Sequence, residues 1–157
     1  MIRSHSDSDW AGCRETRRST SSGTIQLGPV GHVVDHYSVH QQVIALSSAE
    51  AEYYATGKAA AHSLHVQSTL SGVGTDVQIS LFTDSAAAKS ICSRRGMGSK
   101  LRHVQLRYLW VQERLAERAS SLLKVASCDN VAGGTKILLV EVLVGLLRKL
   151  GFSRVTG

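Results

Sequence analysis

The sequence predicts a single α/β domain, because segments that alternate like strands and segments with helical spacing follow one another along the chain. Its 157 residues suit one domain, and a hydrophobic fraction of 43% is enough to bury a core of ordinary size. Short acidic segments at 6–10, 47–53 and 82–85 each stand beside a predicted strand end or helix start. The predicted domain covers residues 1–157.

The first part of the chain is expected to form a hairpin and a third strand. Residues 2–5 open the first strand almost directly from the first residue, which favours an amino end truncated from a longer polyprotein. Residues 14–23 are polar and small enough for a turn, and 24–27 alternate as a strand does. Scattered β-branched residues at 32–43 predict a third strand.

A long helix follows. Ser47, with Glu50 three residues later, is a capping-box signature, and alanine-rich sequence continues the helix to about Leu70. Residues 77–82 then alternate as a strand, and residues 85–89 predict a short helix that the side chain of its first residue can cap. This order places the third acidic segment at a strand-to-helix junction.

The last part of the chain predicts a helix, a strand and a closing helix. Residues 101–116 carry apolar side chains at helical spacing, and residues 122–125 form the last expected strand. Residues 135–157 are interpreted as a closing helix and tail, with a leucine stripe between 139 and 150. That helix is expected to cover the core, and a membrane or partner helix is the alternative.

Composition favours an intracellular protein with a polyanionic partner. Eighteen Lys and Arg against twelve Asp and Glu give a net charge of +6, which favours nucleic acid. Cys13, Cys92 and Cys128 are odd in number and lack zinc-type spacing, which indicates reduced thiols in a cytoplasmic particle or the nucleus. No apolar run reaches the roughly 20 residues that cross a bilayer, and no targeting signal is visible.

Basic residues are concentrated between 85 and 112, where no acidic residue occurs. Such a segment can follow a phosphate backbone, and a solvated basic face without a ligand is the alternative. The segment contains Lys89, Arg94, Arg95, Lys100, Arg102 and Arg107.

The acidic segments predict a metal centre, since carboxylates from separate elements hold paired magnesium ions for phosphodiester chemistry. Asp84 stands at the strand-to-helix junction. Asp7 and Asp9 share one face of a strand, so spacing alone leaves both as candidates. Glu50 and Glu52 point to nearly opposite faces of a helix, so only one can join the centre. Glu52 is the predicted ligand, because its side of the helix carries small alanines, and Glu50 is the predicted cap.

Several motifs, in order and in register, resemble the ribonuclease H domain of copia-type LTR retrotransposon Pol polyproteins. The resemblance covers roughly residues 6–136. It is carried by Ser-Asp-Ser-Asp-Trp-Ala-Gly at 6–12, Ser-Thr-Ser-Ser-Gly at 19–23, Ala-Leu-Ser-Ser-Ala-Glu-Ala-Glu-Tyr at 45–53, Phe-Thr-Asp-Ser-Ala-Ala-Ala at 82–88 and Lys-Leu-Arg-His-Val-Gln-Leu-Arg-Tyr at 100–108.

The resemblance implies a ribonuclease H-like fold, with a mixed five-stranded sheet flanked by helices, and a site with two Mg²⁺ (or Mn²⁺) ions. Asp7, Glu52 and Asp84 match the catalytic, metal-binding positions, and the family alignment favours Asp7 over Asp9. The implied reaction is hydrolysis of the RNA strand of an RNA/DNA hybrid. One ion activates the attacking water and the other stabilises the leaving oxygen.

The resemblance also implies partners. The substrate would be an RNA/DNA hybrid read by its 2′-hydroxyls and shape, and a reverse transcriptase domain of the same polyprotein would act beside it. His103 is an accessory candidate for product release or proton transfer, with a structural role as the alternative. The residues expected to position the nucleic-acid backbone are Arg94, Arg95, Lys100 and Arg102.

The sequence departs from the family pattern at 127–136, where Gly133 replaces the fourth catalytic aspartate and one residue is lost. Losing a charged group at the reacting centre predicts weakened or lost activity. Asp129 is the candidate substitute, four residues early.

Two other functions remain as alternatives. The chain could be a non-catalytic nucleic-acid-binding remnant that binds hybrids through the basic segment. Alternatively, the histidines at 32, 36 and 40 could form an unrelated metal module, because a spacing of four aligns them on a helix. On a strand they would share a face but lie too far apart for one ion.

Overall fold

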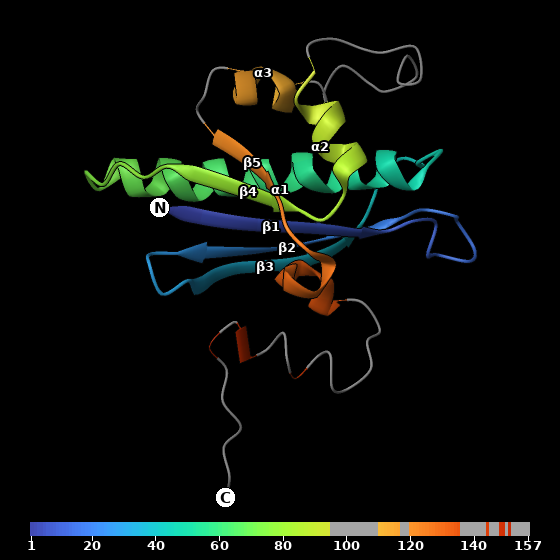
Figure 1. Cartoon of the computed structure of the whole chain (residues 1–157), viewed down its shortest axis with the longest axis horizontal. Coiled ribbons are helices and arrows are strands. Elements are labelled where there is room, and N and C mark those ends of the chain that lie inside the picture. Colours follow the sequence, from blue (N-terminus) through green and yellow to red (C-terminus); the bar gives the residue numbers. More distant parts are fainter. Residues whose placement is uncertain (95–109, 117–119, 136–143, 145–147, 150, 152–157) are drawn as a thin grey trace, which may run out of the picture.

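Five strands form one mixed sheet in the order β3-β2-β1-β4-β5 (Figure 1). β1 pairs antiparallel with β2 and parallel with β4, so the central strand joins the two halves of the sheet. This confirms the predicted fold class. The strands are β1 (Ile2–Asp9), β2 (Thr20–Leu27), β3 (His32–His40), β4 (Ile79–Thr83) and β5 (Ser120–Lys124). The computed structural model describes residues 1–94, 110–116, 120–135, 144, 148–149 and 151.

Strand β1 is twice as long as the segment 2–5 predicted from the sequence. Its pairing with β2 runs without a break from Ile2 opposite Leu27 to Asp9 opposite Thr20. Backbone hydrogen bonds to neighbouring strands extend β1 through its polar second half, which local propensity did not identify. Asp7 therefore lies inside the strand near its end.

The other described strands and the helices α1, α2 and α3 have the predicted types, with shifted boundaries. β2 begins at Thr20, inside the segment 14–23 that was predicted to be a turn. β3 ends at His40, short of the predicted 43, and β4 begins two residues later than predicted and includes Thr83. β5 begins at Ser120, because its whole length pairs in register with β4. Boundary shifts of this size are normal, since strand ends are set by pairing partners that lie far away in the sequence.

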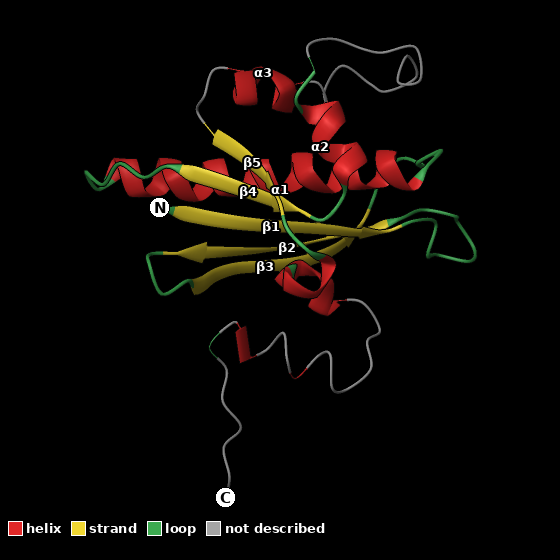
Figure 2. Cartoon of the chain, in the orientation of Figure 1, coloured by secondary structure: helices red, strands yellow, loops and turns green. Residues whose placement is uncertain are grey.

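Helix α1 (Ser48–Gly72) lies across one face of the sheet (Figure 2). Its amino terminus is capped as predicted, because the Ser47 hydroxyl accepts a hydrogen bond from the Glu50 amide at 3.2 Å. Small buried side chains on α1 let it approach β1 closely. Ser4 of β1 donates its hydroxyl hydrogen bond to the Ala59 carbonyl at 3.5 Å, and the Ser6 hydroxyl lies 3.3 Å from that of Thr56.

The short helices lie around this sheet. α2 (Ala86–Cys92) is capped by Ser85, as predicted, and is longer than the expected 85–89. α3 (Trp110–Ala116) is the described end of the predicted helix 101–116, whose first nine residues lie outside the described residues. Two 3-10 helices follow β5, namely η3 (Ser127–Asp129) and η4 (Val131–Thr135). Most of the predicted closing helix also lies outside the described residues.

The core lies between α1 and the sheet. The large side chains that are almost fully buried come from strands β1, β2 and β4 and from α1 and α3, and include Ile2, Ile25, Tyr53, Leu81 and Val111. Among the described residues, no helix has the length and apolar character needed to span a membrane.

Gly23 of β2 is required by the buried ring of Tyr37 on the neighbouring strand β3. A Cβ at position 23 would lie 2.5 Å from the Tyr37 Oη atom. The ring stacks on His62 of α1 with centroids 4.2 Å apart, so it has little freedom to move. Glycine at 23 thus allows Tyr37 to fill the space between the sheet and α1.

Replacing Gly23 with alanine is expected to destabilise the protein by about 1–3 kcal/mol, because the added methyl group overpacks against the Tyr37 ring. Gly57→Ala is the matched control: position 57 lies within α1, where a Cβ would meet no atom within 4 Å. That change should stabilise the protein by about 0.5–1 kcal/mol. Urea denaturation measures both, and equal effects of the two substitutions would contradict this packing argument.

Candidate active site

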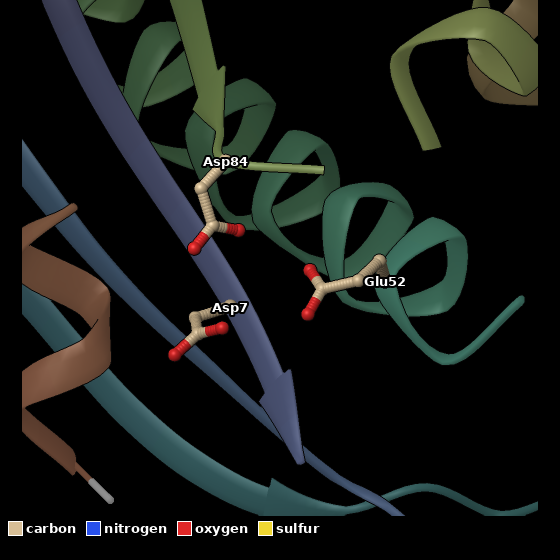
Figure 3. A group of neighbouring side chains, drawn as sticks. All are labelled: Asp7, Glu52 and Asp84. Atoms are coloured by element: carbon tan, nitrogen blue, oxygen red, sulfur yellow. The ribbon is translucent and has the colours of Figure 1, made fainter. Parts of the chain in front are cut away.

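Three carboxylates from three separate elements meet at one edge of the sheet (Figure 3). Asp7 comes from β1, Glu52 from the second turn of α1 and Asp84 from the residue that follows β4. One oxygen from each side chain lies within 4.8 Å of the others. Because β1 and β4 run parallel, their carboxyl ends lie at the same edge, which brings Asp7 and Asp84 together. The structure thus brings together the three side chains that the sequence analysis singled out.

Glu52 is held in the cluster by the residue that follows Asp7. The backbone amide and the hydroxyl of Ser8 both donate hydrogen bonds to Glu52 Oε1, at 3.1 and 2.9 Å. The second oxygen, Oε2, is buried and has no hydrogen-bond partner within the described part of the chain. A buried carboxylate oxygen without a partner costs free energy, so this atom is suited to binding a cation.

Glu50 has the capping role that the sequence analysis gave it. Its Oε2 accepts a hydrogen bond from the Leu46 amide at 3.1 Å, and its Oε1 accepts one from the Tyr54 hydroxyl at 2.5 Å. Both oxygens are thereby turned toward the start of α1 and away from the cluster. Glu50 and Glu52 are only two positions apart, yet the first bonds groups at the start of α1 and the second lies in the carboxylate cluster.

Burial and the neighbouring charges make Glu52 hard to ionise. Burial, and then the charges of Asp7 and Asp84, raise the pKa of Glu52 from 4.5 to about 7, against the opposing effect of the Ser8 hydrogen bonds. A carboxyl group with such a pKa in a cluster of like charges is typical of functional sites.

Gly133 in η4 lies directly beside Asp7. A Cβ at position 133 would lie 3.4 Å from Asp7 Oδ2, which is ordinary van der Waals contact. The segment is anchored by Asn130, whose side-chain amide donates a 2.8 Å hydrogen bond to the Ser6 carbonyl. The Ser22 hydroxyl donates another, of 3.0 Å, to the Ala132 carbonyl. A Cβ at 133 would therefore have room and would lie beside Asp7.

Asp9 and Asp129, the two alternative ligands, lie outside the cluster of three. The Asp9 carboxylate accepts a hydrogen bond from the Thr20 amide and so organises the loop between β1 and β2. Asp129 is exposed and pairs with Lys149. Although Asp7 and Asp9 belong to one strand, only Asp7 has Glu52 and Asp84 within reach.

Among the described residues, the other candidates lie outside the cluster. His32, His36 and His40 lie along strand β3, and among the described residues they form no metal-binding group. Arg94 is exposed just after α2. Arg95, Lys100, Arg102 and His103 lie outside the described residues.

Sequence reasoning missed the supporting residues of the site. Ser8 orients Glu52, while Asn130 and Ser22 hold η4 against the sheet. Ser8 and Ser22 lie inside quoted motifs and Asn130 lies in the segment 127–136, but no local pattern marked their roles, because their contacts join segments that are far apart in the chain.

The donor set fits a hard divalent cation. All three side chains offer oxygen, which is the ligand type that Mg²⁺ and Mn²⁺ prefer, and the partnerless Glu52 Oε2 provides a ready donor atom. Asp7, Glu52 and Asp84 are therefore the described residues that could hold such ions.

Comparison with known sequences finds relatives among retrotransposon polyproteins, although no family model matches the chain. The chain is 26% identical to the retrovirus-related Pol polyprotein from transposon RE2 of Arabidopsis thaliana, over 98% of the chain and 11% of the polyprotein. It is 23% identical to the Pol polyprotein from transposon TNT 1-94 of Nicotiana tabacum, over 93% and 11%. The chain thus spans about a ninth of the length of these homologues, which come from copia-type transposons.

Comparison with solved structures identifies the ribonuclease H fold. The complex of LC11-RNase H1 with an RNA/DNA hybrid matches with a TM-score of 0.57 at 14% identity, covering 83% of this chain and 88% of that one. The N-terminal RNase H domain of Rv2228c from Mycobacterium tuberculosis matches with a TM-score of 0.57 at 12% identity, covering 94% and 96%. The resemblance seen in the motifs is thereby confirmed for both the relatives and the fold.

The raised pKa of Glu52 makes the stability of the metal-free protein depend on pH. Between pH 4.5 and about 7 the folded state keeps a proton that the unfolded state loses, so stability should fall as pH rises through this window. A shift of this size corresponds to at most about 3 kcal/mol. Glu52→Gln, which does not titrate, should remove this loss.

Urea denaturation in EDTA from pH 4 to 8 measures the effect as the difference between parent and Glu52→Gln. Glu50→Gln serves as the control, because Glu50 lies outside the cluster. Parallel pH profiles for the parent and Glu52→Gln would show that Glu52 titrates normally.

Proposed function

We propose that this chain is a ribonuclease H-like domain that hydrolyses the RNA strand of RNA/DNA hybrids with divalent metal ions. The observation that carries the proposal is the convergence of Asp7, Glu52 and Asp84 within 4.8 Å. The homologous Pol polyproteins and the fold of LC11-RNase H1, which was solved with an RNA/DNA hybrid, support it.

The metal would supply two things when bound: a more acidic attacking water and stabilisation of the leaving oxygen. The chain's own residues would hold it. Asp7 and Asp84 are fixed by the parallel pair β1 and β4, and Ser8 keeps the Glu52 carboxylate turned so that its partnerless oxygen stays available. Glu52 must be deprotonated to act as a ligand, so cation binding and proton release are coupled at this residue.

Gly133 is expected to weaken this activity. Its Cα position faces Asp7 Oδ2 but contributes no carboxylate, so the cluster holds three carboxylates where the resemblance implies four. Asp129 is a poor substitute, because its carboxylate is exposed and paired with Lys149. The anchoring of η4 by Asn130 and Ser22 does not depend on a side chain at 133.

The alternative is a non-catalytic domain that still binds nucleic acid. It is favoured by the same absence of a carboxylate at Gly133, and by the net charge of +6, which attracts polyanions whether or not catalysis follows. In either case the chain corresponds to a small part of a Pol polyprotein, so a reverse transcriptase domain is its natural partner.

Cleavage of a labelled RNA/DNA hybrid in Mg²⁺ and in Mn²⁺ separates these functions. We expect slow cleavage by the parent, loss of cleavage in Asp84→Asn, and an increase on the order of a hundredfold or more in Gly133→Asp, because the added carboxylate would complete the charge around the reacting centre. Asp76→Asn is the matched control, since Asp76 is exposed after α1 and lies outside the cluster.

Cleavage that survives Asp84→Asn would come from another site or a contaminant and would contradict the assignment. Cleavage only by Gly133→Asp would identify an intact scaffold that has lost turnover. If neither the parent nor Gly133→Asp cleaves while both unfold cooperatively, the catalytic proposal is refuted, and binding of the hybrid by the parent would then identify the non-catalytic alternative.

Metal binding can be tested without catalysis. Mn²⁺ should raise the melting temperature of the parent, because an ion that binds only the folded state stabilises it; the gain is about 2.7 kcal/mol at a hundredfold excess over Kd. Glu52→Gln should abolish the shift, since it removes the charge of the central ligand. Asp129→Asn is the control, and an equal shift in the parent and Glu52→Gln would refute binding at the cluster.

A further inference from the structure

An exposed apolar patch lies on the loops that border the end of β1 and the start of α1. Trp10, Ile44 and Leu46 are 56%, 55% and 66% exposed, although large apolar side chains of this kind are usually buried. We call these three residues the rim patch. Its members come from the loop after β1 and the loop before α1, the two elements that carry Asp7 and Glu52.

The tryptophan ring is held in place on this surface. Trp10 Nε1 donates a 3.1 Å hydrogen bond to the carbonyl of Ala45, the buried residue between the two exposed aliphatic side chains. Ile44 and Leu46 therefore flank the point where the indole is anchored. Since the only polar atom of the ring is already bonded, its exposed surface can serve apolar contact alone.

The loop that carries Trp10 is ordered by its own hydrogen bonds. The Ala11 amide donates to the Ser19 hydroxyl at 3.0 Å, and the Arg17 amide donates to the Cys13 carbonyl at 2.8 Å. Asp9 closes the loop by accepting from the Thr20 amide. The rim patch is thus a preformed surface, and an occupant would lose little free energy in ordering it.

The charge around the rim patch favours a polyanion. Arg14, Arg17 and Arg18 are all exposed in the same loop, against one exposed acid there, Glu15. Three guanidinium groups beside an apolar platform match a strand that alternates phosphates with sugar and base surfaces. The attraction also offsets the repulsion that a phosphate backbone would meet at the neighbouring carboxylates.

The rim patch lies where a substrate at the carboxylates would extend. Trp10 follows Asp7 by three residues, and the amide of Leu46 is bonded to Glu50, two residues before Glu52. A duplex placed with one phosphodiester at the cluster spans several nucleotides on either side of it, so it would pass over one or both of these loops.

We propose that the rim patch, with the three arginines beside it, is a contact surface for the RNA/DNA hybrid. The apolar side chains lie against sugar faces in its wide, shallow minor groove, and the arginines bind its phosphates. This inference rests on the proposed function for the identity of the ligand. It adds a positioning role for Trp10, Ile44 and Leu46, none of which can bind metal.

The chain provides its own reporter, because it contains two tryptophans. In Trp110→Phe the fluorescence comes from Trp10 alone, and in Trp10→Phe it comes from Trp110, which is half-buried in α3. Acrylamide quenching is measured with and without a saturating RNA/DNA hybrid, in Ca²⁺ so that binding is followed separately from cleavage. Hybrid should lower the quenching constant of Trp10 about twofold or more, since sugars would cover its exposed side.

Affinity gives the second readout. Trp10→Ala and Leu46→Ala should each weaken hybrid binding, by about tenfold for the tryptophan, because the buried apolar contact is lost. Leu46 is 66% exposed, so Leu46→Ala should leave the fold intact, and a loss of affinity in this variant would not reflect misfolding. The matched control is Val30→Ala: Val30 is 79% exposed in the turn between β2 and β3, at the opposite end of the sheet, and should have no effect.

Unchanged quenching of Trp10 on saturation, or unchanged affinity in both alanine variants, would overturn the proposal. Protection of Trp10 that rises with protein concentration in the absence of hybrid would also overturn it, since the occupant would then be a second copy of the chain. Protection by hybrid in a protein that never cleaves would leave the contact surface standing and refute only the catalytic function. Cleavage with no change in Trp10 quenching and no loss of affinity in the alanine variants would refute the contact surface and leave the catalytic function standing.

Discussion

The arrangement of this molecule depends on the central strand β1, which pairs with β2 on one side and with β4 on the other while α1 crosses it. The parallel pairing with β4 puts Asp84 at the same edge as Asp7. The hydroxyl groups of β1 then hold α1 against it, and the last of them, on Ser8, bonds Glu52 directly. One strand thus sets both the packing of the helix and the distances between the carboxylates. Strands β2 and β4, which pair with β1 on its two sides, keep it buried.

The fold brings together three carboxylates that repel one another and wholly or partly buries them, and both the repulsion and the burial cost free energy. Glu52 shows the conflict most clearly, because its pKa is raised to about 7 and one of its oxygens has no partner among the described residues. A divalent cation would relieve both the repulsion and the unpaired oxygen. In the metal-free protein this region therefore works against stability. The hydrogen bonds of Glu50 at the start of α1 are satisfied and show what an acidic residue does when it serves the fold alone.

At position 133, a change that affects the proposed catalytic function need not affect the fold. Nothing in the packing of η4 requires a carboxylate at 133, because Asn130 and Ser22 anchor the segment through its neighbours. A glycine at 133 therefore fits the scaffold, and under the proposed function it leaves the site one carboxylate short. This explains how the ribonuclease H fold persists in a chain whose proposed catalytic group is incomplete. The rim patch is independent of that position, so binding of nucleic acid and turnover would be lost separately.

The sequence by itself determined the features that depend on residues a few positions apart. The capping of α1 by Ser47, the separation of Glu50 from Glu52 on the helix, and the types of the described strands and α-helices all follow from local spacing and residue chemistry. The full length of β1, the placement of Asp9 in a loop contact and the pairing of Asp129 with Lys149 were decided only by the tertiary structure. These depend on strands and side chains that meet across long stretches of chain, and their free energies arise from contacts that no local pattern records.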